Sequence, residues 1–188
     1  ALWFDELTTA YLVRLSSIAE LRTALANGAD AHPFPFYVIT RLATLLLGEA
    51  PLALRLPEML GILIMCLCLY RFVARRCPRP YAWLALLFPF FSTIWRFAYE
   101  GRPYGLMMGS CGLALLCWQW ATDGRRRLGL IGLAGSLAAG VSCNFATAFV
   151  LVPLGLGELV RSLKLRRLDR PVWLAMGGVV PALAAFLP

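Results

Sequence analysis

Charged residues are scarce in this sequence. Only 15% of the 188 residues are Asp, Glu, Lys or Arg, whereas soluble domains carry about 25%, and Lys164 is the sole lysine. The deficit argues against a water-soluble globular protein. The net charge of +8 comes from short arginine clusters between apolar runs. This pattern sets the orientation of membrane proteins, so it does not indicate nucleic-acid binding.

Metal-binding and secretory patterns are also missing. The six cysteines include no Cys-x-x-Cys pair, which argues against a zinc site or a disulfide framework. The chain opens at Ala1 without an initiating Met, a basic start or an apolar run that would mark a signal peptide. It closes inside an apolar run at Pro188. We therefore expect that the sequence begins and ends within a longer protein.

Long apolar runs dominate what is present. Hydrophobic residues make up 60% of the chain and gather in runs of roughly 15 to 20 residues, about the length of a helix that crosses a bilayer. The sequence predicts an all-α, polytopic transmembrane helical bundle within residues 52–188. The six expected spans are 52–72, 81–97 (with a kink at Pro89), 103–121, 128–141, 145–160 and 172–187.

Residues 1–51 differ from the rest and are expected to form an extracytoplasmic loop. Apolar residues at helical spacing predict one or two short amphipathic helices within 1–33, and Asn27-Gly28 marks a turn. Residues 36–47 are apolar but too short to span, and they contain Arg41. This segment therefore predicts an interfacial helix.

The distribution of charge predicts the orientation. Arginine clusters follow the first, third and fifth expected spans, so they share one face if every run crosses once. The positive-inside rule makes that face cytoplasmic. The opposite face receives residues 1–51 and the turns at 99–102 and 142–144. Its acidic residues are Asp5, Glu6, Glu20, Asp30, Glu49 and Glu100.

Candidate catalytic carboxylates lie on this outer face. Asp5-Glu6 can supply a general base and a partner that tunes its pKa or binds a cation; the structural alternative is an acidic first turn stabilised by the helix dipole. In the turn at 96–104, Glu100 offers a carboxylate, Arg102 offers donors suited to phosphate and Tyr104 can stack on a sugar. The alternative there is an aromatic belt with a local Arg–Glu pair.

Three further candidates for substrate binding have structural alternatives. His32 lies in a proline-rich turn, where it can bind phosphate or sugar hydroxyls or serve as an interfacial structural histidine. Arg55 lies at the outer mouth of the first span, but its spacing from Glu58 favours an ion pair between the two. Asn144 can bind a ligand or cap the following helix.

These segments, in this order, resemble the GT-C glycosyltransferases, especially the bacterial relatives of protein O-mannosyltransferases and the lipid A aminoarabinose transferase. The resemblance rests on an acidic pair, a His-Pro-Pro-Leu-Tyr-like segment, an Arg-Leu-Pro and an Arg-Glu-Ala-Arg-Pro-Tyr-like turn. Their counterparts here are residues 3–6, 32–37, 54–57 and 99–104. Two positions depart from the family pattern: Phe34 replaces its second proline, and Asn144 stands where many relatives have a histidine.

The resemblance implies a sugar donor on a polyprenyl phosphate and transfer with inversion to an acceptor lipid, glycan or protein. The reaction would take place at the extracytoplasmic face of a bacterial inner membrane. By the same resemblance, Asp5 is the base for the acceptor hydroxyl, Glu6 and Glu100 shape the site or hold a divalent cation, and Arg102 meets the lipid phosphate. Whether a metal is used stays open.

Two other functions are compatible with a membrane bundle. A transporter or flippase would place ionisable residues and broken helices at mid-membrane, whereas the expected spans are largely free of charge at their centres. A non-catalytic assembly protein would keep the fold without the chemistry. The enzyme hypothesis requires Asp5 and Glu100, which are remote in sequence, to converge in one water-accessible pocket.

Overall fold

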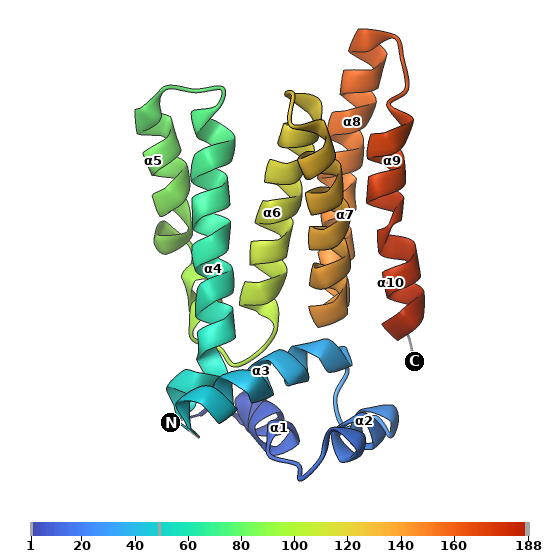
Figure 1. Cartoon of the computed structure of the whole chain (residues 1–188). Helices are drawn as coiled ribbons and strands as arrows, with labels where there is room; N and C mark the ends of the chain where they lie inside the picture. Colours follow the sequence, from blue (N-terminus) through green and yellow to red (C-terminus); the bar gives the residue numbers. More distant parts are fainter. Residues whose placement is uncertain (1, 49, 187–188) are drawn as a thin grey trace.

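The computed structural model describes residues 2–48 and 50–186, so Glu49 and Leu187 lie outside the described residues. Within these ranges the chain is helical and has no strand. The helices from α4 onward run side by side as a bundle, and α1, α2 and α3 lie across one end of it (Figure 1). We call this the acidic end, after Asp5, Glu6, Asp30 and Glu100; the opposite end, with the loops at 75–79, 125–127 and 166–170, is the arginine end.

Three helices form the N-terminal layer: α1 (Phe4–Val13), α2 (Ile18–Ala26) and α3 (Phe34–Leu47). The hydroxyl of Ser17 caps α2 by accepting the N–H of Glu20 at 3.1 Å. Gly28 follows α2 with φ of +79°, a conformation that favours glycine. Pro35 lies in the first turn of α3, where its missing N–H breaks no helical bond.

Two segments are long and apolar enough to cross a membrane: α4 (Pro51–Ala74), and Phe145–Leu165, which joins the 3-10 helix η3 (Phe145–Val150) to α8 (Leu151–Leu165). They contain the first and fifth expected spans. The long helices α6 (Tyr104–Thr122) and α7 (Arg126–Cys143) correspond to the third and fourth. The prediction of about six spans is therefore not confirmed, although the all-helical class is.

The expected span at 81–97 is not one kinked helix. It consists of α5 (Arg79–Leu87) and two 3-10 helices, η1 (Phe88–Phe91) and η2 (Thr93–Ala98). Pro89 has no N–H to donate and cannot make the hydrogen bond that would continue the α-helix, so the α-helix ends at Leu87 and the chain goes on as a 3-10 helix. The last expected span is likewise divided, into α9 (Arg170–Gly177) and α10 (Val179–Phe186).

Glycines bring α4 and α6 into backbone contact near the acidic end. A Cβ atom added to Gly109 would lie only 2.6 Å from the carbonyl oxygen of Gly61, and one added to Gly105 would collide with the backbone of Glu58. Small residues allow membrane helices to approach this closely. On α7, a Cβ atom added to Gly140 would collide with Thr147 and Ser110, whereas one added to Gly135 would meet nothing within 4 Å.

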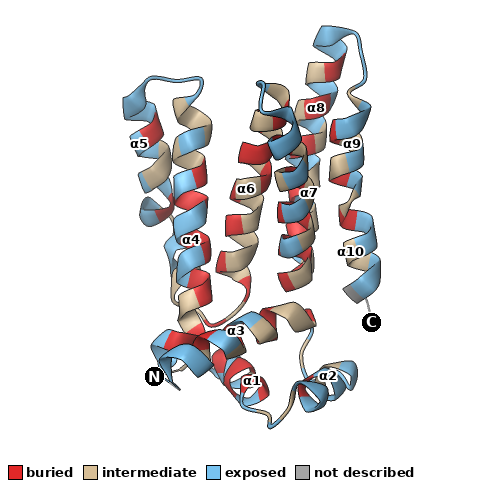
Figure 2. Ribbon diagram, in the orientation of Figure 1, coloured by how far each residue is buried: buried red, intermediate tan, exposed pale blue. Residues whose placement is uncertain are grey.

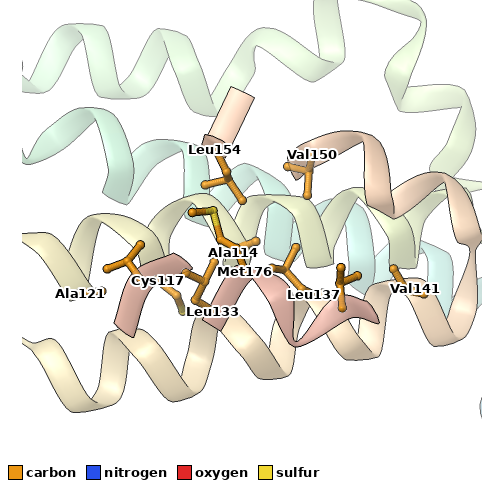
Figure 3. Packing of buried hydrophobic residues seen from close by; sticks show 11 residues of the cluster. Ala114, Cys117, Ala121, Leu133, Leu137, Val141, Val150, Leu154 and Met176 are labelled. Carbon is orange, nitrogen blue, oxygen red and sulfur yellow. The ribbon is translucent and has the colours of Figure 1, made fainter. Parts of the chain in front are cut away.

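The main core lies between α6, α7, α8 and α9 (Figure 3), where Leu133 and Leu137 are fully buried. The six cysteines are free thiols, and four of them are buried. By contrast, exposed residues run along the outer faces of the bundle helices (Figure 2), and many of them are large and apolar; Leu63 is 53% exposed and Leu163 is 69% exposed. Such extensive exposed apolar surface is expected where the surrounding medium is lipid.

Candidate active site

Two segments far apart in the sequence meet at the acidic end. Glu6, in the first turn of α1, accepts the backbone N–H of Gly101 at 2.7 Å through Oε1. Gly101 belongs to the short turn that precedes α6. This bond brings the neighbours of the two residues, Asp5 and Glu100, into the same region of the molecule.

Glu6 is a buried anchor for this region. Its carboxylate accepts two bonds from Arg55, Nε to Oε1 at 2.8 Å and Nη2 to Oε2 at 2.7 Å, and one from the N–H of Trp3 at 2.9 Å. Burial alone raises the pKa of Glu6, but the hydrogen bonds from Arg55, Trp3 and Gly101 outweigh it and leave the pKa below its usual value. Glu6 therefore stays ionised and occupied by donors, so it is poorly suited to be a general base.

The predicted ion pair between Arg55 and Glu58 is wrong. Arg55 reaches back to α1, and Glu58 turns toward the start of α6, where its Oε2 accepts the N–H of Leu106 at 3.0 Å. The first N–H groups of a helix have no partner within the helix, so one of them is free to donate to Glu58. The spacing of Arg55 and Glu58 within α4 does not reveal that other helices offer each of them a different partner.

A second buried ion pair joins Arg102 to Asp30. Nη1 of Arg102 lies 2.5 Å from Oδ2 of Asp30, and the two side chains are 16% and 8% exposed. Burial raises the pKa of Asp30, but its contact with Arg102 brings the pKa below its usual value. The same carboxylate, together with burial, raises the pKa of Tyr37. The sequence reading took Asp30 only as part of a turn, because nothing local links it to a residue 72 positions later.

His32 and Tyr104 lie beside this ion pair. Their rings meet edge to face, with centroids 6.3 Å apart. Burial and the nearby positive charge of Arg102 lower the pKa of His32, so its imidazole is neutral at neutral pH. One polar and aromatic cluster is thus formed by His32, Arg102 and Tyr104. It adjoins Glu6 and its donors, because Gly101, which donates to Glu6, directly precedes Arg102.

Asp5 and Glu100 are the acids without partners here. Asp5 is exposed and Glu100 is partly exposed, and neither makes a side-chain hydrogen bond or ion pair with any residue in the described ranges. The predicted pocket around them is not among the cavities that we describe. A cavity of about 160 Å³ lies between Val13 and Arg41, and one of about 650 Å³ lies near the arginine end. A pocket between the two acids therefore stays a prediction.

The side chain of Asn144 caps a helix, as one of the two alternatives predicted. Its side-chain oxygen accepts the N–H of Ala146 at 2.9 Å, which caps η3, and the residue is buried. A side chain used in this way is less available to a ligand than the sequence reading allowed.

The described part of the chain does not gather ligands for a metal. No group of three His, Cys, Asp or Glu side chains is placed to hold an ion there. Glu6, one of the predicted cation ligands, already accepts four hydrogen bonds. These side chains do not fit a resident divalent cation, so we derive no catalytic step from one.

Comparison with known families identifies the class of protein. A family model described as dolichyl-phosphate-mannose-protein mannosyltransferase matches residues 31–188. The chain belongs to this family. The resemblance inferred from the ordered motifs is thereby confirmed: the mannosyltransferase family consists of membrane-integral glycosyltransferases of the GT-C type.

The family match covers the cluster of His32 and Arg102 together with Arg55, Glu100 and Asn144, and it begins after Asp5 and Glu6. No curated protein and no solved structure matches the chain. Membership in a glycosyltransferase family favours an enzyme over the transporter and flippase alternative.

Proposed function

We propose that this glycosyltransferase moves a sugar from a polyprenyl-phosphate donor to an acceptor lipid, glycan or protein at the extracytoplasmic face of a bacterial inner membrane. The observation that carries the proposal is the 2.7 Å bond from Gly101 to Glu6. It assembles two acids without partners, Asp5 and Glu100, next to the phosphate-binding candidate Arg102, within a chain of this family.

Asp5 is the proposed general base. In a single displacement, its carboxylate takes the proton of the acceptor hydroxyl as that oxygen attacks the anomeric carbon, and the lipid phosphate leaves from the opposite side with the bonding electrons. This route inverts the configuration of the sugar. The carboxylate of Asp5 is exposed and has no ion-pair partner among the described residues, so an acceptor hydroxyl can reach it, whereas the carboxylate of Glu6 is occupied by Arg55. Glu100 lies across the Glu6–Gly101 contact, where it can bind sugar hydroxyls.

Arg102 is proposed to bind the departing phosphate. Guanidinium groups suit phosphate because they present several donors in a plane, and stabilising charge on a leaving group lowers the reaction barrier. Arg102 holds Asp30 through its two terminal nitrogens, and its Nε has no hydrogen-bond partner in the described ranges. The donor phosphate would share the guanidinium with Asp30. Neutral His32 can hydrogen-bond a phosphate oxygen, and Tyr104 can pack on the sugar ring.

The arrangement of the bundle supports an extracytoplasmic site. The loops rich in arginine lie at the end of the bundle opposite the N-terminal layer (Figure 1). Because arginine-rich loops are retained in the cytoplasm, the acidic end faces the other side. A lipid-linked donor would then approach along the exposed apolar faces of the helices, with its phosphate at the membrane surface.

The test is sugar transfer by purified full-length protein carrying Asp5→Asn, assayed against a panel of polyprenyl-phosphate sugars. General-base catalysis contributes on the order of 10²–10⁴-fold, so we expect a loss of that size. Thermal stability should not change, because Asp5 has no partner in the described structure. Asp123→Asn, at the arginine end, serves as the matched control. Unchanged transfer by Asp5→Asn would show that the base is assigned wrongly.

A further inference from the structure

The helices α4 and α6 touch near the acidic end and separate toward the arginine end (Figure 1). Where they have separated, the side chain of Gln119 bridges them by donating to the carbonyl oxygen of Phe72 at 3.0 Å. A cavity of about 650 Å³ lies beside this bridge, on both helices. Its volume is within the range of about 300–1,000 Å³ that is typical of ligand sites in proteins.

The floor of this cavity is apolar and borders the membrane. Ile64 and Leu67 line it from α4, and Leu113 and Leu116 line it from α6. Leu67 is 50% exposed, although α4 is one of the two helices suited to cross a bilayer. A cavity that opens sideways from such a helix is filled from the hydrocarbon phase, since water gains few hydrogen bonds from leucine and isoleucine.

The mouth of the cavity is positively charged. Arg71, Arg75 and Arg125 line it at the arginine end. Asp123 neutralises part of this charge, because it lies 3.9 Å from Arg75 and 3.3 Å from Arg76. Arg71 and Arg125 have no carboxylate within ion-pair distance in the part of the chain that the structure describes. Arg125 instead lies over the ring of Trp120, 5.9 Å from its centroid, which holds the guanidinium near the opening.

We propose that this cavity binds an anionic phospholipid of the surrounding membrane, with one acyl chain between α4 and α6 and the headgroup phosphate between Arg71 and Arg125. A hydrocarbon floor beneath two unneutralised arginines matches an anionic lipid in both polarity and charge. A zwitterionic lipid offers the same chain but no net negative charge. This site lies at the opposite end of the bundle from Asp5 and Arg102, so it is separate from the proposed donor site and does not depend on it.

The experiment uses full-length protein in phosphatidylcholine vesicles that contain a minority of phosphatidylglycerol with a photoreactive group on its acyl chain. After illumination, labelled peptides are identified by mass spectrometry. We expect labelling of the α4 and α6 segments that contain Leu67 and Leu113. The double variant Arg71→Gln/Arg125→Gln should reduce it about tenfold, since basic residues near the membrane surface attract anionic lipids. The matched control is Arg79→Gln/Arg127→Gln, which removes the same charge from the arginine end at two residues that do not line the cavity.

Two more arms identify the occupant. Unlabelled phosphatidylglycerol should compete with the probe, whereas phosphatidylcholine and glycerol phosphate should not. Leu67→Trp, which fills the floor, should reduce labelling even with both arginines intact. Equal labelling by a phosphatidylcholine probe, equal loss in the two double variants or displacement by glycerol phosphate would each overturn the proposal. The first would indicate ordinary bulk lipid, the second a general charge effect and the third a site for a soluble anion.

Discussion

Arginine pairs with acidic residues at both ends of the bundle, but the two ends use the acids differently. Every described Asp or Glu that lies at the arginine end is paired with an arginine. At the acidic end, only some of the described acids have an arginine partner. The acids paired with arginine are Asp123, Glu158 and Asp169 at the first end and Glu6 and Asp30 at the second. Glu20 and Glu58 instead accept hydrogen bonds from Ser16 and from the N–H of Leu106, whereas Asp5 and Glu100 have no ion pair among the described residues. We propose that the acids paired with arginine join segments of the chain and that Asp5 and Glu100 are left for the reaction.

The arginine end shows what a purely structural network looks like. Arg161 bridges Glu158 and Asp169, with a distance of 2.6 Å to each. Arg126 also binds Asp169 at 2.5 Å, and the indole N–H of Trp118 donates to Glu158 at 3.0 Å. These contacts join α6, α7 and α8 to the loop before α9. No carboxylate in this network is left without a partner.

The largest expected effect on stability comes from Glu6→Gln. Removing one member of a buried ion pair costs about 3 kcal/mol. Arg55 and the N–H of Gly101 would both lose the anion that holds them. Chemical unfolding in detergent micelles measures this loss.

The neighbouring residue is the control for that variant. Asp5→Asn, on the same turn of α1, should change stability by less than about 0.5 kcal/mol, as is usual for surface substitutions, although it abolishes most transfer. Equal losses of stability in the two variants would contradict the distinction between an anchoring acid and a reactive one. The double variant Glu6→Gln/Arg55→Gln should recover part of the loss, since the guanidinium that Glu6 bound is then removed as well.

Glu158→Gln should destabilise the protein by about 2 kcal/mol, somewhat less than Glu6→Gln. Arg161 would still have Asp169 as a partner, so its charge stays compensated. Trp118→Phe removes only the indole donor, and about 1 kcal/mol is expected from that variant. The same unfolding assay ranks the three variants, and a loss with Glu158→Gln larger than that with Glu6→Gln would reverse the comparison.

Acid should weaken the arginine end through Asp169. The guanidinium groups of Arg126 and Arg161 lower the pKa of this carboxyl to about 2, from 3.8. A carboxyl with a depressed pKa contributes stability above its unfolded value, near pH 4, and loses it as pH falls toward 2. The contribution is on the order of 1–2 kcal/mol, given partial exposure. Unfolding curves at pH 6 and pH 3 measure it, and Asp169→Asn should flatten the difference.

The smallest effect is expected from Asp123→Asn. Its partners Arg75 and Arg76 are substantially exposed, and exposed ion pairs contribute about 0–1 kcal/mol. Neither stability nor sugar transfer should change measurably. A loss of transfer would mean that the arginine end takes part in the reaction, and the functional contrast between the ends would then fail.

The sequence predicted the helices from their apolar runs, and it predicted from the order of the loops that residues 1–51 and the turn at 99–102 share one end of the bundle. Apolar runs correspond to α4, α6, α7 and the segment Phe145–Leu165. Alternation of loops placed Asp5 and Glu100 on one face, and the bond from Gly101 to Glu6 shows their segments together.

Sequence patterns did not predict the features that depend on contacts between segments remote in the sequence. Arg55 binds Glu6, 49 residues away in the sequence, and Arg102 binds Asp30, 72 residues away. No local spacing encodes such pairs. The apolar run around Pro89 looked like a span because hydropathy records composition and not backbone geometry. The pocket expected beside Asp5 stays a prediction for a similar reason: topology brings segments to one face but does not determine the shape of the surface between them.

The glycine contact between α4 and α6 has a mechanical consequence. Where the two backbones touch, no side chain lies between them that could change its conformation. The contact can therefore act as a fulcrum, a fixed point about which one helix rotates against the other. Gly105 is at this fulcrum, three residues after Arg102. If α4 and α6 move apart at the arginine end, α6 rotates about this contact. The turn that carries Glu100 lies next to the contact, so it moves very little. Hydrocarbon can then enter or leave one half of the bundle while the reacting groups in the other half stay aligned.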